Sequence, residues 1–199
     1  LPAQELGTCV IAVRPRKGAI SGLTFDYKEK PEHEYITSIV AGGAIGFADG
    51  NGASAKIHQP EGIAMDPSGN LWITQRGTSG YAIRKMDRSF NVTTVLETEL
   101  PWQCCFDKKG DFYFTAKDKN WVGKITPDGT FSQLSLTGAE IKAPMDVEFD
   151  QDGAMWVVSR NNNKVYKFVN NAKVTEWDLN YPTCLSLDRN GRMIIGSTL

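Results

Sequence analysis

Three cationic side chains recur at one fixed offset in this sequence, and their type and spacing suggest anion binding. Arg76, Lys117 and Arg160 each lie sixteen residues after a proline. If successive copies are related by rotation, residues at one offset form a ring on one face, where cations can hold a carboxylate or phosphate. Asp118 follows Lys117 and cancels part of this charge, so a polar, solvated loop is the competing interpretation.

A second group of candidates lies one and two residues after the same prolines. Its members are Glu61, Trp102, Gln103, Met145 and Asp146. Carboxylate and amide oxygens around one axis are the ligands that calcium prefers, but the oxygen-bearing side chains here are few and of mixed type. Trp102 and Met145 suit instead a ligand with an apolar or sugar-like face.

Taken together, the two groups predict one ligand site on one face. The predicted ligand-binding residues are Arg76, Lys117, Arg160, Trp102, Gln103 and Asp146. The expected ligand is small and either anionic or carbohydrate-like, with a protein partner as the alternative. No metal or cofactor is predicted, and calcium is kept as the weaker alternative.

Four copies of one short pattern must position these residues. Each copy begins with a proline and carries an aspartate six residues later and a glycine nine residues later. The prolines are Pro60, Pro101, Pro144 and Pro182, the aspartates Asp66, Asp107, Asp150 and Asp188, and the glycines Gly69, Gly110, Gly153 and Gly191. Proline-to-proline spacings of 41, 43 and 38 residues are typical of solenoids, propellers and other arrays.

One copy predicts a strand, a tight turn and a second strand. In the first copy these are residues 63–65, 66–70 and 71–74. Aspartate accepts backbone hydrogen bonds in such a turn, and glycine supplies the positive φ that closes it. Further short runs at residues 82–86 and 92–95 complete the unit. Four strands in about 40 residues make one β-propeller blade, so the predicted fold is all-β with four-stranded antiparallel blades.

The first copy resembles an NHL repeat. The similarity rests on Gly-Phe-Ala-Asp-Gly-Asn-Gly at residues 46–52, Gln-Pro-Glu-Gly-Ile-Ala-Met-Asp at 59–66, Gly-Asn-Leu-Trp-Ile at 69–73 and Ile-Arg-Lys-Met at 83–86. Later copies are also similar to the propeller repeats of streptogramin lyases, as at residues 123–125 and 128–129. The resemblance covers residues 35–199 and implies a propeller, but this scaffold carries enzymes, RNA binders and interaction modules alike.

One departure from the NHL pattern bears on the site. Gln75, Ala116 and Ser159 stand where NHL repeats commonly carry aspartate. The family's interactions at that position therefore cannot be transferred to this chain.

The strand count predicts an incomplete ring. Residues 60–181 make three complete units, and the fourth unit has two strands before Leu199. Residues 35–40 match the outermost-strand runs, and residues 9–13 or 23–27 would supply a third strand and close a ring of four blades. The preferred interpretation is that further blades complete a ring of about six.

The chain before the repeats is predicted to be a separate region, so residues 1–30 and 31–199 are expected to differ in fold. Two alternating runs at residues 7–13 and 21–27 resemble the last two strands of an IPT/TIG domain, and an extra β-hairpin is the alternative. This arrangement resembles that of bacterial envelope proteins, which implies a location in the cell envelope or outside the cell.

Catalytic residue types are scarce. The histidines are His33 and His58, whereas zinc-dependent propeller lyases need several histidines, and the resemblance to streptogramin lyases implies one near the blade tops. His58 is therefore interpreted as a loop histidine. No serine, cysteine or histidine arrangement pairs a nucleophile with a base.

The cysteines offer no zinc site either. Cys9, Cys104, Cys105 and Cys184 lack zinc spacing, and Cys104 is expected to be a small buried core residue. A disulfide from Cys104 or Cys105 to Cys184 would need the strands closer than alternate blades normally lie.

Composition limits the partners. A net charge of −1 argues against a nucleic-acid partner, since such proteins usually carry a basic excess. No apolar run of about 18 residues predicts a membrane span. The sequence thus favours a non-catalytic binding module that uses one face of a propeller. The alternative is a hydrolase or lyase whose site is completed by blades outside this chain.

Overall fold

The chain has two parts that are described separately. The computed structural model describes residues 10–13, 21–24 and 40–198. Contacts divide the chain into one unit of residues 1–38 and another of residues 39–199. In the first unit, β1 (Val10–Val13) pairs antiparallel with β2 (Ser21–Thr24), the hairpin-like pairing expected from the sequence. The assignment to an IPT/TIG domain and the boundary at residue 30 stay predictions.

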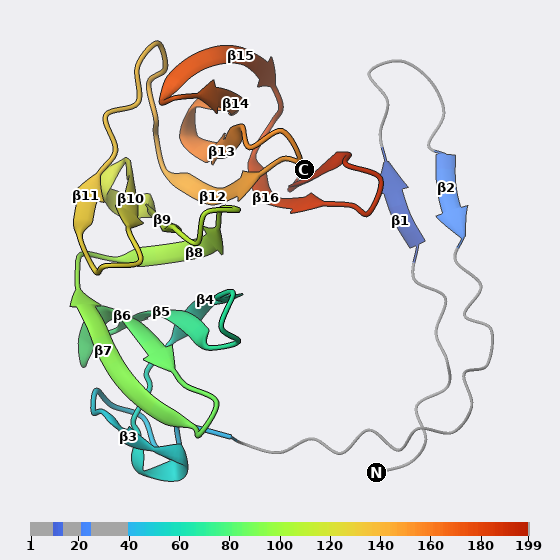
Figure 1. Ribbon diagram of the computed structural model, residues 1–199. Helices are drawn as coiled ribbons and strands as arrows, with labels where there is room; N and C mark the ends of the chain where they lie inside the picture. The colour runs from blue at the N-terminus through green and yellow to red at the C-terminus, as the bar shows by residue number, and fades with distance from the viewer. Residues whose placement is uncertain (1–9, 14–20, 25–39, 199) are drawn as a thin grey trace. The chain divides into compact units, whose positions relative to one another are not determined.

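The second unit is a series of antiparallel sheets in chain order (Figure 1). Blade 1 contains β3 (Gly50–Asn51), β4 (Pro60–Met65), β5 (Leu71–Gly77), β6 (Gly80–Met86) and β7 (Asn91–Glu97). Blade 2 contains β8 (Pro101–Phe106), β9 (Phe112–Ala116), β10 (Trp121–Ile125) and β11 (Phe131–Gln133). Blade 3 contains β12 (Pro144–Phe149), β13 (Met155–Ser159), β14 (Lys164–Val169) and β15 (Ala172–Asp178). Blade 4 contains β16 (Pro182–Leu187) and β17 (Met193–Ser197) among the described residues.

The blades are arranged around the strands that begin with the repeated prolines. Strand β8 contacts β4 on one side and β12 on the other, and β12 also contacts β16. In Figure 1 these four strands lie along the inner side of the arc, and β7, β11 and β15 lie outside. The fold is therefore the all-β propeller of four-stranded blades that the repeat predicts.

Blade 1 differs from the prediction at its outer edge. A short strand, β3, pairs with β7 through Gly50 opposite Val92 and makes this sheet five-stranded. The sequence analysis did not predict this strand, and it offered residues 35–40 as an outermost strand for the incomplete fourth blade. Most of that segment lies outside the described residues, and Val40 is not in a strand.

The turns between the first two strands have the predicted chemistry. In blade 1, Asp66 Oδ1 accepts hydrogen bonds from the backbone N–H groups of Ser68 and Asn70 at 3.0 and 2.8 Å. The other three turns repeat these bonds to Asp107, Asp150 and Asp188. Gly69 has φ 82°, which only glycine adopts without strain.

The same aspartates also bind the second strand, which the sequence analysis missed. The indole Nε1 of Trp72 donates to Asp66 Oδ2 at 3.2 Å, and that of Trp156 donates to Asp150 Oδ2 at 2.9 Å. These two turns are therefore tied to aromatic side chains that pack between blades.

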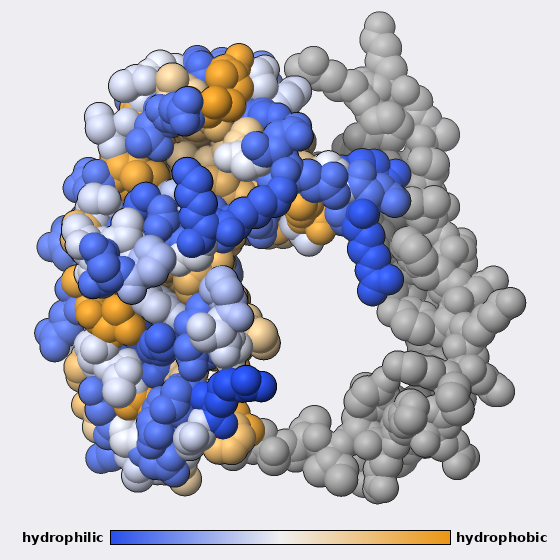
Figure 2. Space-filling model, in the orientation of Figure 1, coloured by the Kyte–Doolittle hydropathy of each residue, from blue (hydrophilic) through white to orange (hydrophobic). Residues whose placement is uncertain are grey.

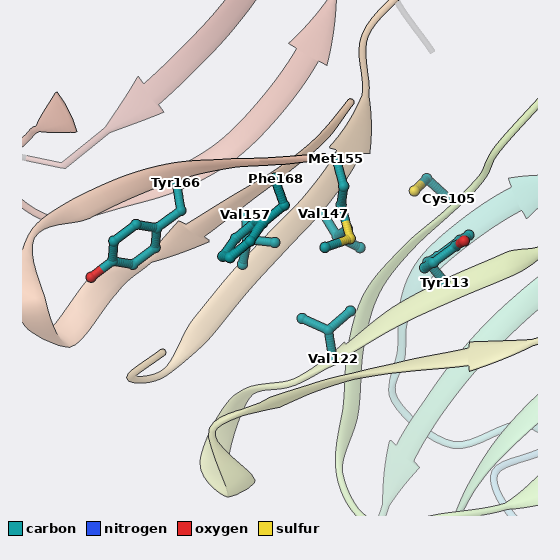
Figure 3. Packing of buried hydrophobic residues seen from close by; sticks show 8 residues of the cluster. All are labelled: Cys105, Tyr113, Val122, Val147, Met155, Val157, Tyr166 and Phe168. Atoms are coloured by element: carbon teal, nitrogen blue, oxygen red, sulfur yellow. The ribbon is translucent and has the colours of Figure 1, made fainter. Parts of the chain in front are cut away.

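Hydrophobic clusters fill the spaces between successive blades. Between blades 2 and 3, side chains of both sheets meet, as Figure 3 shows. The cluster contains Cys105, Tyr113 and Val122 from blade 2 and Val147, Met155, Val157, Tyr166 and Phe168 from blade 3. Further clusters occupy the other two junctions. Burial of this apolar surface is the main force that holds each blade against the next.

The visible surface of this unit is mixed rather than uniformly apolar. Hydrophilic side chains cover most of the view in Figure 2, and the hydrophobic ones form separate patches. Among the described residues, no helix has the length and apolar character needed to cross a membrane.

Candidate functional site

One end of the blades, here called the proline face, brings together the predicted site residues. At this end the chain passes through a proline into each inner strand. In register, Pro60 lies opposite Gln75 and Pro144 opposite Ser159, so the loop that follows the second strand lies at the same end. The backbone N–H of Arg76 donates to Gln59 O and that of Arg160 donates to Ala143 O, both at 3.2 Å.

The backbone at the proline face is strained in all four blades. The residue before each proline is left-handed: Gln59, Leu100, Ala143 and Tyr181 have φ of 47°, 46°, 47° and 45°. Each proline is followed by a shift in strand register of the β-bulge type. Bulges re-aim side chains, and strained non-glycine residues persist where the surrounding structure holds them, often at functional sites. The repeated strain therefore favours the proline face as the candidate functional site.

Two predicted cations meet one predicted aromatic side chain at the junction of blades 1 and 2. The guanidinium carbon of Arg76 lies 4.3 Å from the Trp102 ring centroid, and Lys117 Nζ lies 4.2 Å from it. Glu61 Oε1 pairs with Arg76 Nη1 at 3.2 Å. We call Glu61, Arg76, Trp102 and Lys117 the indole cluster. It combines two cations, one aromatic ring and one carboxylate.

Close packing of the inner strands places Trp102. Its carbonyl accepts a hydrogen bond from the Thr74 hydroxyl, which in turn accepts one from Gly62 N–H at 2.7 Å. A Cβ at Gly62 would lie 2.9 Å from Trp102 O and 3.1 Å from Cys104 Sγ. Glycine at this position therefore permits β4 and β8 to approach, which holds the indole beside Arg76.

Gln103 links the same two strands. Its amide Nε2 donates to Glu61 O at 3.3 Å, and its backbone N–H donates to Thr115 Oγ1 at 3.2 Å. One donor of the predicted ligand-binding amide is thus used within the protein. Gln103 supports the backbone of the indole cluster.

Asp146 links blades 3 and 4. Its Oδ2 accepts a hydrogen bond from Leu185 N–H at 2.7 Å, and its Oδ1 accepts one from Val147 N–H at 2.8 Å. Burial raises the pKa of this carboxyl to about 6 against the opposing effect of these two bonds, and Glu148 adds to the rise. Both oxygens are therefore engaged in the fold.

Arg160 lies on the same face but apart from the indole cluster. Among the described residues it has no ion pair or aromatic partner. Its own blade carries Met145 at the position of Trp102, and that side chain is buried, with 6% exposure. Three of the six predicted residues thus meet, Gln103 bonds to the backbone of their cluster, and Asp146 and Arg160 do not join it.

His58 has a partner that sequence reasoning did not find. Its Nδ1 lies 3.1 Å from Ser79 Oγ, and Gly77 N–H donates to His58 O at 3.2 Å. This pair lies at the proline face of blade 1, beside the strand that carries Arg76. The two residues are 21 positions apart, with β4 and β5 between them, so the sequence showed no recognisable motif.

Metal-binding and thiol chemistry receive no direct support. In the parts of the chain that the structure describes, no three His, Cys, Asp or Glu side chains gather as metal ligands. Cys104, expected to be a small buried core residue, is partly buried and packs against the cluster between blades 1 and 2, whereas Cys105 is the buried thiol, with 7% exposure. Cys104, Cys105 and Cys184 are free. Cys9 lies outside the described residues, and calcium stays untested.

The inner strands, the turns and the proline-face loops define a β-propeller of four-stranded antiparallel blades. The chain belongs to the virginiamycin B lyase family, whose model matches residues 51–193. The resemblance to streptogramin lyases is thus confirmed at the family level, whereas the NHL assignment stays a prediction. No curated protein matches the chain significantly.

Solved structures show the same fold. Virginiamycin B lyase from Staphylococcus aureus is 23% identical, with a TM-score of 0.58 over 68% of this chain and 48% of that one. A gluconolactonase from Xanthomonas campestris is 16% identical, with a TM-score of 0.60 over 70% and 54%. The calcium-binding protein regucalcin from Agrobacterium tumefaciens is 20% identical, with a TM-score of 0.53 over 65% and 48%. The chain spans about half the length of these structures.

Proposed function

We propose that this chain is a binding module that holds a small anionic ligand at the indole cluster. The observation that carries the proposal is the approach of Arg76 and Lys117, from two different blades, to one indole ring. Within the described residues, Glu61 is the carboxylate that pairs with Arg76, so the cluster retains an excess of positive charge. Such a site attracts a carboxylate or phosphate.

The cluster combines charge with an apolar surface. A ligand carboxylate or phosphate would accept charge-assisted hydrogen bonds from Arg76 and Lys117, and the ring that carries it would pack beside Trp102. The side chain of Arg76 is 26% exposed and Lys117 is partly exposed, so both are accessible from solvent. A sugar acid and an aromatic acid both fit this description.

A matched pair of sugars tests the proposal. Glucuronate and glucose share the same sugar ring, but only glucuronate carries a carboxylate. A difference in binding between the two sugars therefore measures the effect of the negative charge. We expect indole NMR signals to shift with glucuronate and much less with glucose. Arg76→Ala and Lys117→Ala should each weaken binding about tenfold, because each removes one charged contact. Arg160→Ala is the control, because Arg160 has the same position in its repeat but lies outside the indole cluster. The proposal is contradicted if Arg76→Ala leaves glucuronate binding unchanged, or if Arg160→Ala weakens it equally.

The second candidate function is a lyase or hydrolase whose site is completed outside this chain. His58, with Ser79 as its neighbour, favours it, because a histidine on the proline face can act as a general acid or base. One solved relative is a catalytically inactive variant of the Staphylococcus aureus lyase, with histidine replaced by alanine and quinupristin bound. That chain is 22% identical, so its chemistry is a hypothesis for this one.

Turnover separates the two candidates. The assay would offer quinupristin, simple lactones and amidated peptides to the protein, with and without added calcium or zinc, and would follow products by mass spectrometry. Linearised or cleaved product that is lost in His58→Ala supports the enzyme. Retained glucuronate binding without turnover supports the binding module.

A further inference from the structure

Two asparagine–glycine pairs in the chain differ in how the fold holds them. They are Asn51–Gly52, at the outer edge of blade 1, and Asn190–Gly191, in the turn between β16 and β17. Asparagine is a thermolabile residue, and a following glycine has no side chain to hinder attack on the amide by its backbone nitrogen. In a folded protein the attack depends on how easily the local structure opens.

The first pair is held by hydrogen bonds from both of its residues. The side-chain Nδ2 of Asn51 donates to Ser89 O at 2.8 Å and to Asn91 Oδ1 at 2.9 Å. The backbone N–H of Gly52 donates to Phe90 O at 2.9 Å. The side chain of Asn51 therefore cannot turn toward the glycine nitrogen until several of these bonds break.

The second pair is held by its backbone. The N–H of Asn190 donates to Asp188 Oδ1 at 2.9 Å, and the N–H of Gly191 donates to Asp188 O at 3.1 Å. The side chain of Asn190 is exposed and has no hydrogen-bond partner among the described residues. Opening of one turn is therefore enough to bring the amide and the glycine nitrogen together.

Exposure of this turn position recurs in every blade and does not depend on the place of a blade in the series. Asn190 lies eight residues after its proline, and the residues at that offset in the other blades, Ser68, Lys109 and Asp152, are also exposed. Blades 2 and 3 have four strands each and contact a blade on either side. Neighbouring strands thus leave this position open to solvent.

We propose that Asn190 is a site of spontaneous deamidation and that the fold protects Asn51 from the same reaction. The nitrogen of Gly191 bonds to Cγ of Asn190, and the bond from Cγ to the side-chain nitrogen breaks. That nitrogen leaves as ammonia with the proton from the Gly191 nitrogen, and a succinimide ring remains. Water then opens the ring at either carbonyl, which gives aspartate or isoaspartate and adds one negative charge.

Isoaspartate at this position should weaken the contact between the turns of blades 3 and 4. A Cβ at Gly191 would lie 2.7 Å from Gln151 Oε1, so the backbone of one turn lies against the side chain of the other. Lys108 Nζ donates to Gln151 O from blade 2, so the same turn also contacts the preceding blade. Isoaspartate adds one carbon to the backbone beside this contact.

Peptide mapping by mass spectrometry after incubation of the full chain at neutral pH tests the proposal. The peptide that contains Asn190 should gain the mass of an amide-to-acid conversion and separate into aspartate and isoaspartate forms. Asn190 should react about tenfold faster than Asn51, because two side-chain hydrogen bonds must break before Asn51 can react. Asn190→Ser should remove the products at this site and leave the circular dichroism unchanged.

Unfolding in urea is the control for the local sequence. Both pairs should then react at similar rates, because the hydrogen bonds that distinguish them are lost. In the folded protein, Asn91→Ala removes one acceptor of Asn51 and should speed the reaction there. The proposal is overturned if Asn190 stays intact in the folded protein while it reacts in urea, or if folded wild-type protein loses Asn51 as fast as Asn190.

Thermal unfolding tests the effect on the turn contact. Isoaspartate-containing protein, separated by ion exchange, should unfold at a lower temperature than Asn190→Asp, which carries the same charge without the added backbone carbon. Equal unfolding temperatures would show that the turn of blade 4 does not stabilise the junction with blade 3.

Discussion

The carboxylate of Asp146 accepts a hydrogen bond from the backbone N–H of Leu185 at 2.7 Å, across the junction of blades 3 and 4. The inner strands β12 and β16 are thus joined by a buried acid with a pKa that burial raises to about 6. Because this acid lies between two blades, its ionisation should make the stability of the propeller depend on pH.

We predict that Asp146 makes the free energy of unfolding fall as pH rises. The folded-state pKa of about 6 lies above the ordinary aspartate value of 3.8, so the favourable contribution of Asp146 is complete below the lower value and is lost as pH rises through the higher one. Urea unfolding of the wild type and of Asp146→Asn at several pH values measures this. Their difference in stability should change between these two pH values and stay constant above, and a constant difference throughout would refute the assignment.

The opposite sign is expected for the turn aspartates. Burial of Asp150 opposes ionisation, but bonds from Lys167, Trp156 and Ala154 outweigh it and lower its pKa from 3.8 to about 2. Its contribution to stability is therefore present above the unfolded value and is lost as pH falls through about 2. Asp150→Ala should cost about 2–4 kcal/mol near neutral pH, because it leaves charged and buried partners unsatisfied.

The control for this variant lies in the same turn. Asp152→Ala removes an exposed carboxylate two residues away and should change the stability by less than about 0.5 kcal/mol. Thermal unfolding of both variants at neutral and acidic pH gives the comparison. Equal effects of the two substitutions would show that the turn bonds of Asp150 contribute little.

The proline-led repeat predicted the blades because its information is local. Asp66 and Gly69 encode a turn, and the apolar runs on each side encode strands, so neither requires knowledge of distant residues. The left-handed φ of Leu100 was not predictable in this way. A residue before proline ordinarily favours an extended backbone, and here the strained value accompanies the bulge that follows Pro101.

The candidate site was predicted only in part for the same reason. Rotational equivalence placed Arg76 and Lys117 on one face. Their contact with an indole ring depends on the residue that follows the proline of blade 2, which is Trp102. Where Trp102 is replaced by the buried Met145, Arg160 has no comparable indole. The hydrogen bond of Asp146 to the fold was not predictable from the sequence, because its backbone partner, Leu185, is 39 residues away.

A buried arginine is predicted to hold the loop before β4. The side chain of Arg84 has no exposed surface, and its Nη2 donates to Asp49 Oδ1 at 2.8 Å and to Ala48 O at 2.9 Å. Arg84→Met should destabilise the protein by about 3–5 kcal/mol, because Asp49 and Gln75 lose their buried partner. Limited proteolysis should then cut first near residues 46–56. Arg88→Met alters an exposed arginine and should leave the cleavage pattern unchanged.

The thiols should react in an order set by burial. Cys184 is exposed and Cys104 is partly buried, whereas Cys105 is 7% exposed and burial raises its thiol pKa well above the usual value. Because the thiolate is the reactive form, iodoacetamide should modify Cys184 first and Cys105 only after unfolding. Peptide mapping by mass spectrometry identifies each product. Modification of Cys105 in the folded protein at the rate of Cys184 would mean that the junction between blades 2 and 3 opens, since Cys105 packs there with Tyr113 and Val147.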